Sequence, residues 1–187
     1  MAIKRFVIDG YGQIELNNCA FRRDGRIEAQ CALDATDFAT LPAENGMLLA
    51  VDNVTRTVRF PDTTEDCPIA INYTTEHMYD ERIPGLKNFK LDRGTFLPRL
   101  GYLATGDKFT TNCFSYDADD FADDDAIKAI KLSGEGAVVV YASEYNNGDG
   151  TIVLKKTTAT SGKKVNLKVI EVTTMPDGTF GLKFQVI

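Results

Sequence analysis

The stretch VNLKVIEVTTMPDGTFGLKFQVI, residues 165–187, carries the clearest signal of the fold. Both of its halves are rich in β-branched and aromatic residues, which favour strands. The sequence MPDG between the halves is typical of a tight turn. In the second half, apolar side chains alternate with polar or small ones and therefore share one face of a strand; these are Phe180, Leu182, Phe184 and Val186. We predict a β-hairpin with one buried face and one solvated face.

Segments of similar composition precede this hairpin. Strand-like stretches occupy residues 136–145, 151–158, 165–174 and 179–187, and the turn-forming sequences NNGDG, TSGKK and MPDG separate them. Residues 46–52 and 53–61 form a further predicted hairpin, in which Val54, Val58 and Phe60 share a face, and residues 67–75 and 106–116 are also strand-like. The predicted fold class is mainly β with a minor α component. We expect an antiparallel β-barrel or sandwich whose C-terminal half is a meander.

One short helix is predicted in DDDAIKAIKL, residues 123–132. Three aspartates at its start and Lys128 and Lys131 near its end complement the helix dipole. Ile127 and Ile130 supply a narrow apolar stripe.

The first forty residues differ in style from the rest. They mix charges with isolated apolar residues, so residues 1–40 are predicted to be an extended arm or an edge hairpin. Residues 41–187 are predicted to form a single β-rich domain. Residues 76–100 contain two prolines and two glycines and are predicted to be a long irregular loop.

Composition excludes several classes of protein. The 187 residues contain no run of 18 apolar residues, so we expect no membrane association. The start of the chain has no signal-peptide pattern, so we expect synthesis in the cytoplasm. The net charge is −6, and residues 61–130 hold 14 acidic against 7 basic side chains, which disfavours nucleic-acid binding. The four cysteines, Cys19, Cys31, Cys67 and Cys113, are too widely spaced for a zinc site and are expected to be free thiols.

Motifs for catalysis and for cofactor binding are largely missing from the sequence. The single histidine, His77, lies among polar residues, and neither a G-x-S-x-G motif nor a nucleotide-binding glycine loop occurs. The acidic run DADDFADDD, residues 117–125, does not match the EF-hand pattern. We interpret it as the solvated start of a helix and NNGDG as a hairpin turn. Weak calcium binding stays an alternative at both places. The sequence also does not exclude the paired carboxylates of a glycoside hydrolase, because two such residues come together in space and need no fixed spacing along the chain. We predict no enzyme activity and no cofactor.

The stretch LPAENGMLLAVD, residues 41–52, raises the question of a catalytic turn. It contains no Ser, Cys or His, and the sequence suggests no partner for Glu44. Asn45 and Gly46 supply the positive φ that a tight turn requires. We interpret this stretch as a turn that opens a buried strand from Met47 to Val51.

Three stretches together resemble a known group of proteins. AENGMLLAVDNVTRTVRFP (43–61), GDKFTTNCFSYD (106–117) and VIEVTTMPDGTFGLKFQVI (169–187) are similar, in this order and spacing, to head decoration, cement or other minor capsid proteins of tailed bacteriophages. The resemblance covers roughly 50 residues, and the order of the motifs is more specific than any one of them. It does not account for the N-terminal segment or the acidic helix.

The resemblance implies a non-enzymatic β-rich protein that binds and stabilises the outside of an assembled capsid. Its partner would be the major capsid protein, its location the virion, and a homo-oligomer at a capsid symmetry axis is compatible with it. The expected capsid-binding residues are Lys4, Arg5, Phe6, Phe21, Arg22, Arg23 and Arg26, with the cations pairing with shell carboxylates and the two Phe residues acting as apolar anchors. The alternative for these residues is that the cations are ordinary surface charges on an edge hairpin. The alternative for the whole chain is a carbohydrate- or receptor-binding β-module that uses the loop HMYDERIPGLKNF, residues 77–89.

Overall fold

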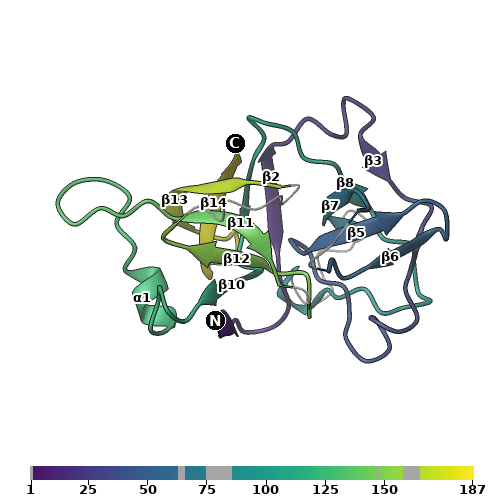
Figure 1. Cartoon of the computed structure of the whole chain (residues 1–187), viewed down its shortest axis with the longest axis horizontal. Helices are drawn as coiled ribbons and strands as arrows, with labels where there is room; N and C mark the ends of the chain where they lie inside the picture. Colours follow the sequence, from purple (N-terminus) through teal and green to yellow (C-terminus); the bar gives the residue numbers. More distant parts are fainter. Residues whose placement is uncertain (1, 63–65, 75–85, 147, 158–164) are drawn as a thin grey trace.

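The computed structural model describes residues 2–62, 66–74, 86–146, 148–157 and 165–187. The described part of the chain is mainly β, with 36% strand and one short α-helix, which confirms the mainly β fold class. The strands form two sheets that lie side by side, and the arrangement is sandwich-like rather than a closed barrel (Figure 1).

The larger sheet has eight strands in the order β1-β10-β12-β11-β13-β14-β9-β2. Their bounds are β1 (Ile3–Arg5), β2 (Ile14–Asn18), β9 (Lys108–Thr111), β10 (Phe114–Asp117), β11 (Tyr141–Tyr145), β12 (Ile152–Lys155), β13 (Leu167–Thr174) and β14 (Phe180–Val186). All neighbours are antiparallel except β10 and β12. The sheet is therefore mixed.

The smaller sheet has six strands in the order β3-β8-β7-β5-β6-β4. Their bounds are β3 (Ile27–Glu28), β4 (Ala32–Leu33), β5 (Leu48–Asp52), β6 (Thr57–Arg59), β7 (Ile69–Asn72) and β8 (Leu100–Gly101). The predicted hairpin is confirmed, since β5 and β6 pair antiparallel with Val51 opposite Val58. Val54, expected beside Val58, lies instead in the exposed turn between these strands, because the turn takes residues 53–56.

The eight-stranded sheet curls strongly. Strands β9 and β10 are separated by four other strands, which in a flat sheet would place them about 24 Å apart. Only two residues, Asn112 and Cys113, connect them, and the three Cα–Cα steps from Thr111 to Phe114 span at most about 11 Å. The sheet must therefore bend round until β10 approaches β9. Edge strands β1 and β2 are not paired with each other, so the curl stops short of a closed barrel.

Two apolar clusters form the core. One lies between the curled sheet and one face of the smaller sheet; it includes Phe109, Phe114, Leu182 and Phe184 from the first and Leu48, Ala50 and Ile71 from the second. The other covers the opposite face of the smaller sheet and includes Leu49, Val51, Val58, Ala70 and Leu91. Strand β5 is thus buried on both faces, which is why its sequence is an unbroken apolar run rather than an alternating one.

The C-terminal strands follow the prediction in position but not in order. The alternation in β14 is confirmed, because Leu182, Phe184 and Val186 are buried. Strand β13 pairs with β11 rather than with β12, so the strands are not arranged as a simple meander. Residues 136–140 precede β11 and form no strand, and the stretch 106–116 is two strands, because the chain bends at Asn112 and Cys113.

The predicted helix is present but shorter. Helix α1 (Asp124–Lys128) begins after Asp123, whose carboxylate accepts a hydrogen bond from the Ala126 amide and so caps the first turn. Ile127 is fully buried and Ile130 packs against the same cluster, as the apolar stripe predicted. Lys131 lies beyond the end of the helix.

The first forty residues occupy all four sheet edges. Strands β1 and β2 are the two edges of the curled sheet, and β3 and β4 are the two edges of the smaller one. In Figure 1 this segment runs from the N-terminus at the bottom, through β2 at the centre, to β3 at the upper right. The four strands within residues 2–40 are therefore edge strands, and they do not pair with one another as a hairpin.

Candidate functional site

The turn from Glu44 to Met47 lies where the two sheets meet. Gly46 has φ +93°, and its amide donates to the Asn72 carbonyl at 2.9 Å. A Cβ on Gly46 would lie 2.9 Å from the Cys113 Cβ and closer still to the Thr111 hydroxyl. Both the backbone conformation and the close approach to β9 therefore require glycine at this position.

Glu44 is the centre of this junction. It is 8% exposed, and its Oε2 accepts hydrogen bonds from Arg5 Nη2 at 2.6 Å and from the Gly12 amide at 2.5 Å. One carboxylate oxygen thus joins β1, the β1–β2 connection and the turn before β5. The sequence suggested no partner for Glu44, because Arg5 lies 39 residues earlier and no local pattern links the two.

Arg5 also approaches the turn between β11 and β12. Its Nη1 lies 3.8 Å from Asp149 Oδ2, and its Nη2 lies 3.9 Å from Cys113 Sγ. Burial acts to lower the pKa of Arg5, but the negative charges around it outweigh this and raise its pKa overall. The guanidinium is therefore a permanent cation held between two carboxylates.

A polar network extends from this junction into the interior. The side-chain Nδ2 of Asn72 donates to the Glu44 carbonyl at 2.9 Å, and the Thr74 hydroxyl donates to Asn72 Oδ1. The Thr74 hydroxyl also accepts from the backbone amide of Arg99 at 3.0 Å. On the other side, Asp149 Oδ1 accepts from the Thr151 amide and hydroxyl. These bonds satisfy polar groups that are otherwise shut away from water, which makes the junction stiff.

The three stretches that carry the phage resemblance converge at this junction. Gly46 packs on Thr111 and Cys113. Thr111 in turn lies opposite Leu182 where β9 pairs with β14. Gln13 links the third stretch, since its amide donates to Asn112 Oδ1 at 2.8 Å and its side chain donates to Asp177 Oδ2 at 2.9 Å. Three turns far apart in sequence therefore form one contiguous structural unit.

The cysteine at the junction has the properties of a packing residue. Cys113 is fully buried, and burial raises the pKa of its thiol, an effect that Arg5 only partly opposes. A thiol that stays protonated and out of contact with solvent is a poor nucleophile. All four cysteines are free, and burial likewise raises the pKa of Cys19 to about 12.

The seven predicted capsid-binding residues fall into two separate groups. Lys4, Arg5 and Phe6 belong to the first strand or follow it directly, whereas the other four lie in the β2–β3 connection or at its end. Figure 1 shows the N-terminus and this connection at opposite ends of the view, so the fold does not gather the seven side chains into one patch.

Both predicted apolar anchors are interior residues. Phe6 is 2% exposed and its ring lies 4.7 Å from that of Phe114. Phe21 is fully buried, with its ring 4.9 Å from that of Tyr73 and in contact with Gly101. Neither ring is available on the surface of the folded chain, because each completes the core beneath an edge strand.

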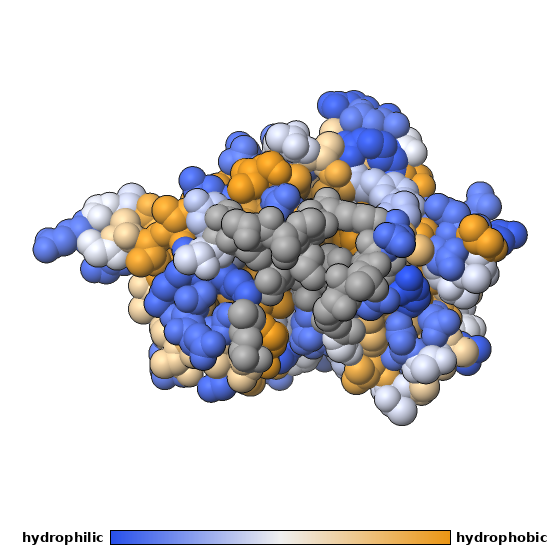
Figure 2. All heavy atoms as spheres, in the orientation of Figure 1, coloured by the Kyte–Doolittle hydropathy of each residue, from blue (hydrophilic) through white to orange (hydrophobic). Residues whose placement is uncertain are grey.

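The predicted cations differ in their availability. The Arg23 side chain is 80% exposed and forms a surface ion pair with its neighbour Asp24. Arg26 is held by the Tyr102 carbonyl and lies 3.7 Å from the buried Asp107 carboxylate. The β2–β3 connection, which also carries Arg22, forms a strongly hydrophilic projection at the top of Figure 2. Arg22 and Arg23 thus lie on a protruding surface, and Arg26 anchors it.

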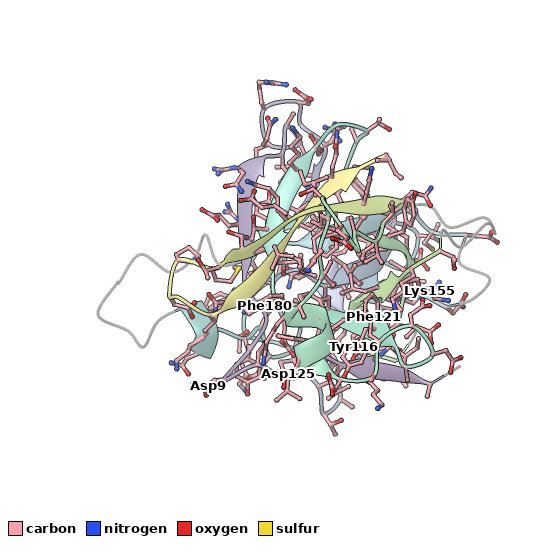
Figure 3. The ribbon with its side chains drawn as sticks, turned by 90° about the vertical axis from the view of Figure 1, so that its left-hand side faces the viewer. Asp9, Tyr116, Phe121, Asp125, Lys155 and Phe180 are labelled. Atoms are coloured by element: carbon pink, nitrogen blue, oxygen red, sulfur yellow. The ribbon has the colours of Figure 1, made fainter. Side chains whose placement is uncertain are left out.

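The aspartates of residues 117–125 serve separate structural purposes. Asp117 is buried and forms an ion pair with the equally buried Lys155 on β12, with Nζ and Oδ2 3.6 Å apart, next to Tyr116 and Phe121 (Figure 3). Asp120 accepts from the Lys156 amide, Asp123 caps α1, and Asp124 accepts from the Val7 amide. Among the described residues no group of three metal-ligating side chains converges, so the alternative of calcium binding gains no support.

Other predicted features lie partly outside the description. His77 and most of the loop 77–89 fall outside the described residues. At the end of that loop, Leu86–Asn88 form a short 3-10 turn and Phe89 is buried, so this aromatic ring is not an exposed sugar platform. Within the described ranges, no helix is long and apolar enough to cross a membrane.

Comparison of the chain with models of protein families, with curated proteins and with solved structures yields no match.

Proposed function

We propose that this chain is a non-enzymatic structural protein that binds and stabilises the outside of an assembled bacteriophage capsid. The observation that carries the proposal is the convergence of the three resembling stretches at the Glu44 junction. Turns such as E-N-G and P-D-G are common one at a time. Here both are linked to the Thr111–Cys113 segment, the E-N-G turn directly through Gly46 and the P-D-G turn through Gln13, which supports the interpretation that they mark one inherited structural feature.

The chemistry of the junction supports a binding role rather than catalysis. Glu44 accepts two hydrogen bonds from the fold itself, and Cys113 is protonated and buried. Each group is thus engaged in holding strands together. A nucleophile needs access to a substrate, which the buried Cys113 thiol lacks, and the Glu44 oxygen that accepts from Arg5 and Gly12 is already occupied by donors of the fold.

The proposed contact uses the projecting β2–β3 connection. Arg22 and Arg23 would pair there with carboxylates of the major capsid protein, and the arginine side chain suits such pairs because its planar fork binds carboxylates with two hydrogen bonds. A stable docked protein needs about 1,200–2,000 Å² of buried surface in total, so the contact must extend beyond this projection. Docking of several copies around a symmetry axis would supply that area.

Cosedimentation with capsid shells of the encoding phage tests the proposal. We expect the protein to pellet with shells in a saturable manner and the double variant Arg22→Glu/Arg23→Glu to lose most of this binding. The matched control is Lys128→Glu/Lys131→Glu, which makes the same charge change around α1 and should bind as the wild type does. Absence of the wild-type protein from the shell pellet would refute the proposal, and binding to a glycan array in its place would favour the receptor-binding module.

A further inference from the structure

A pocket of about 330 Å³ opens beside the Arg5–Glu44 ion pair. Its lining combines a charged part with an apolar part; the residues are Arg5, Leu41, Pro42, Glu44, Met47, Asn146, Gly148 and Asp149. The volume lies at the small end of the range of about 300–1,000 Å³ for ligand pockets, so it fits a single side chain better than a cofactor.

The charges of the pocket do not balance. Two carboxylates, Glu44 and Asp149, face one guanidinium, that of Arg5, and the neighbouring Cys113 thiol is protonated. The side chains of Glu44 and Asp149 are only 11% and 21% exposed, so water and salt screen the excess negative charge incompletely. The pocket therefore favours a cation over an anion.

One oxygen in the pocket is poorly satisfied. Asp149 Oδ1 accepts from the amide and the hydroxyl of Thr151, whereas Arg5 Nη1 lies 3.8 Å from Oδ2, which is too long for a hydrogen bond. Within the described residues, no hydrogen bond reaches Oδ2. An ammonium or guanidinium group entering the pocket would supply the missing donor.

We propose that this pocket binds the side chain of a lysine or arginine from a partner protein. The cationic group would contact Asp149 Oδ2 and lie near Glu44, while the alkyl stem would pack along Leu41, Pro42 and Met47. Leu41 is 46% exposed at present and would lose solvent contact on binding. The proposal rests on the proposed function only for the source of the side chain, which would be an exposed basic residue of the major capsid protein.

An NMR titration tests the pocket without any capsid. The probe is N-acetyl-lysine amide, and the signals to follow are the amides of Gly12, Gly148 and Thr151, which bond to or line the pocket. We expect saturable shifts of these amides with the lysine probe. The same compound acetylated on its ε-amine, and N-acetyl-glutamate amide, should produce none.

Two variants keep the test decisive. Asp149→Asn removes the unbalanced charge and should weaken the lysine probe at least about tenfold. Because Asp149 also holds Thr151, Leu41→Ser provides a variant at an exposed position and should weaken the probe about threefold through loss of apolar contact. Asp125→Asn, an equal charge change on α1 at a side chain that is 89% exposed, is the matched control and should leave the titration unchanged.

Several results would overturn the proposal. These are absence of saturable shifts with the lysine probe, equal shifts in Asp149→Asn, or a stronger response to the glutamate probe, which would make Arg5 the recognition group. Shell binding is measured separately. A protein that binds shells but not the lysine probe would refute only the pocket, and one that binds the probe but not the shells would refute only the proposed function.

Discussion

The first forty residues and the last twenty-three are held in the fold in different ways. Strands β13 and β14 have eight and seven residues and pair with each other along nearly their whole length. Strands β1 to β4 have two to five residues each and lie at sheet edges, so each forms a ladder on one side only. Side-chain contacts of Arg5, Phe6 and Phe21 replace the missing ladder bonds. Long strands are thus held by backbone pairing, and short edge strands by anchors.

The largest expected effect tests whether an edge anchor matters as much as a central side chain. Phe21→Ala removes a fully buried ring that packs against Tyr73 and Gly101 and should lower the free energy of unfolding by about 3–5 kcal/mol, as should Phe184→Ala in β14. Urea denaturation measures both. Ile27→Ala, at a side chain that is largely solvated on β3, is the control and should cost less than about 1 kcal/mol. A small effect of Phe21→Ala would mean that the edge strands contribute little to the stability of the fold.

A smaller effect is expected from the ion pair that fixes β1. Arg5→Met leaves the buried Glu44 carboxylate with only the Gly12 amide and should lower the free energy of unfolding by about 1–3 kcal/mol. Lys4→Met is the matched control on the same strand. Among the described residues the Lys4 ammonium group donates to the Ala122 carbonyl alone, at 3.5 Å, and the loss of this exposed contact should cost less than about 0.5 kcal/mol. Equal losses for the two variants would contradict the role of Glu44 as an anchor.

The pH dependence of stability compares one carboxylate from each region. Hydrogen bonds from the Thr36 and Asp37 amides lower the pKa of Asp34. Burial acts to raise the pKa of Asp177, but hydrogen bonds from Gln13 and Thr179 outweigh it and lower that pKa. A lowered pKa in the folded state contributes stability above the unfolded-state value of about 3.9, and the contribution disappears as pH falls through the folded-state pKa.

Asp34→Asn and Asp177→Asn should therefore each be slightly less stable than the wild type at pH 7, and the difference should shrink as the pH falls below about 4. Urea midpoints measured from pH 7 down to pH 2.5 report this. A difference that grows on acidification would contradict the sign of either shift.

The smallest effect involves no change in global stability. Amide hydrogens of β1 should exchange faster than those at the centre of β13, because a three-residue edge strand opens locally at a lower free energy than a central one. Hydrogen exchange followed by NMR measures this in the wild type. Slower exchange of the Phe6 amide, which donates to the Phe114 carbonyl, than of β13 amides would show that the anchors hold the edge as firmly as pairing holds the centre.

Prediction from sequence succeeded where a signal is local. The alternation in β14, the buried run of β5, the turn at Gly46 and the acidic start of α1 all depend on residues within a few positions of one another. It failed where two distant segments meet. No local pattern pairs Arg5 with Glu44, places β13 beside β11, or turns Phe6 and Phe21 inward beneath edge strands.

The sequence by itself determined that this protein is mainly β, where several of its turns fall, such as those at Gly46 and at residues 175–178, and which faces of its longer strands are buried. Periodicity and turn chemistry are properties of the chain over a few residues, and they survive in any arrangement of the strands. Only the tertiary structure decided that the first forty residues close all four sheet edges and that Glu44 joins three segments beside a pocket. Pairing between distant strands depends on the fit of side chains across the sheet rather than on intrinsic backbone preference, so it is fixed only when the whole core assembles.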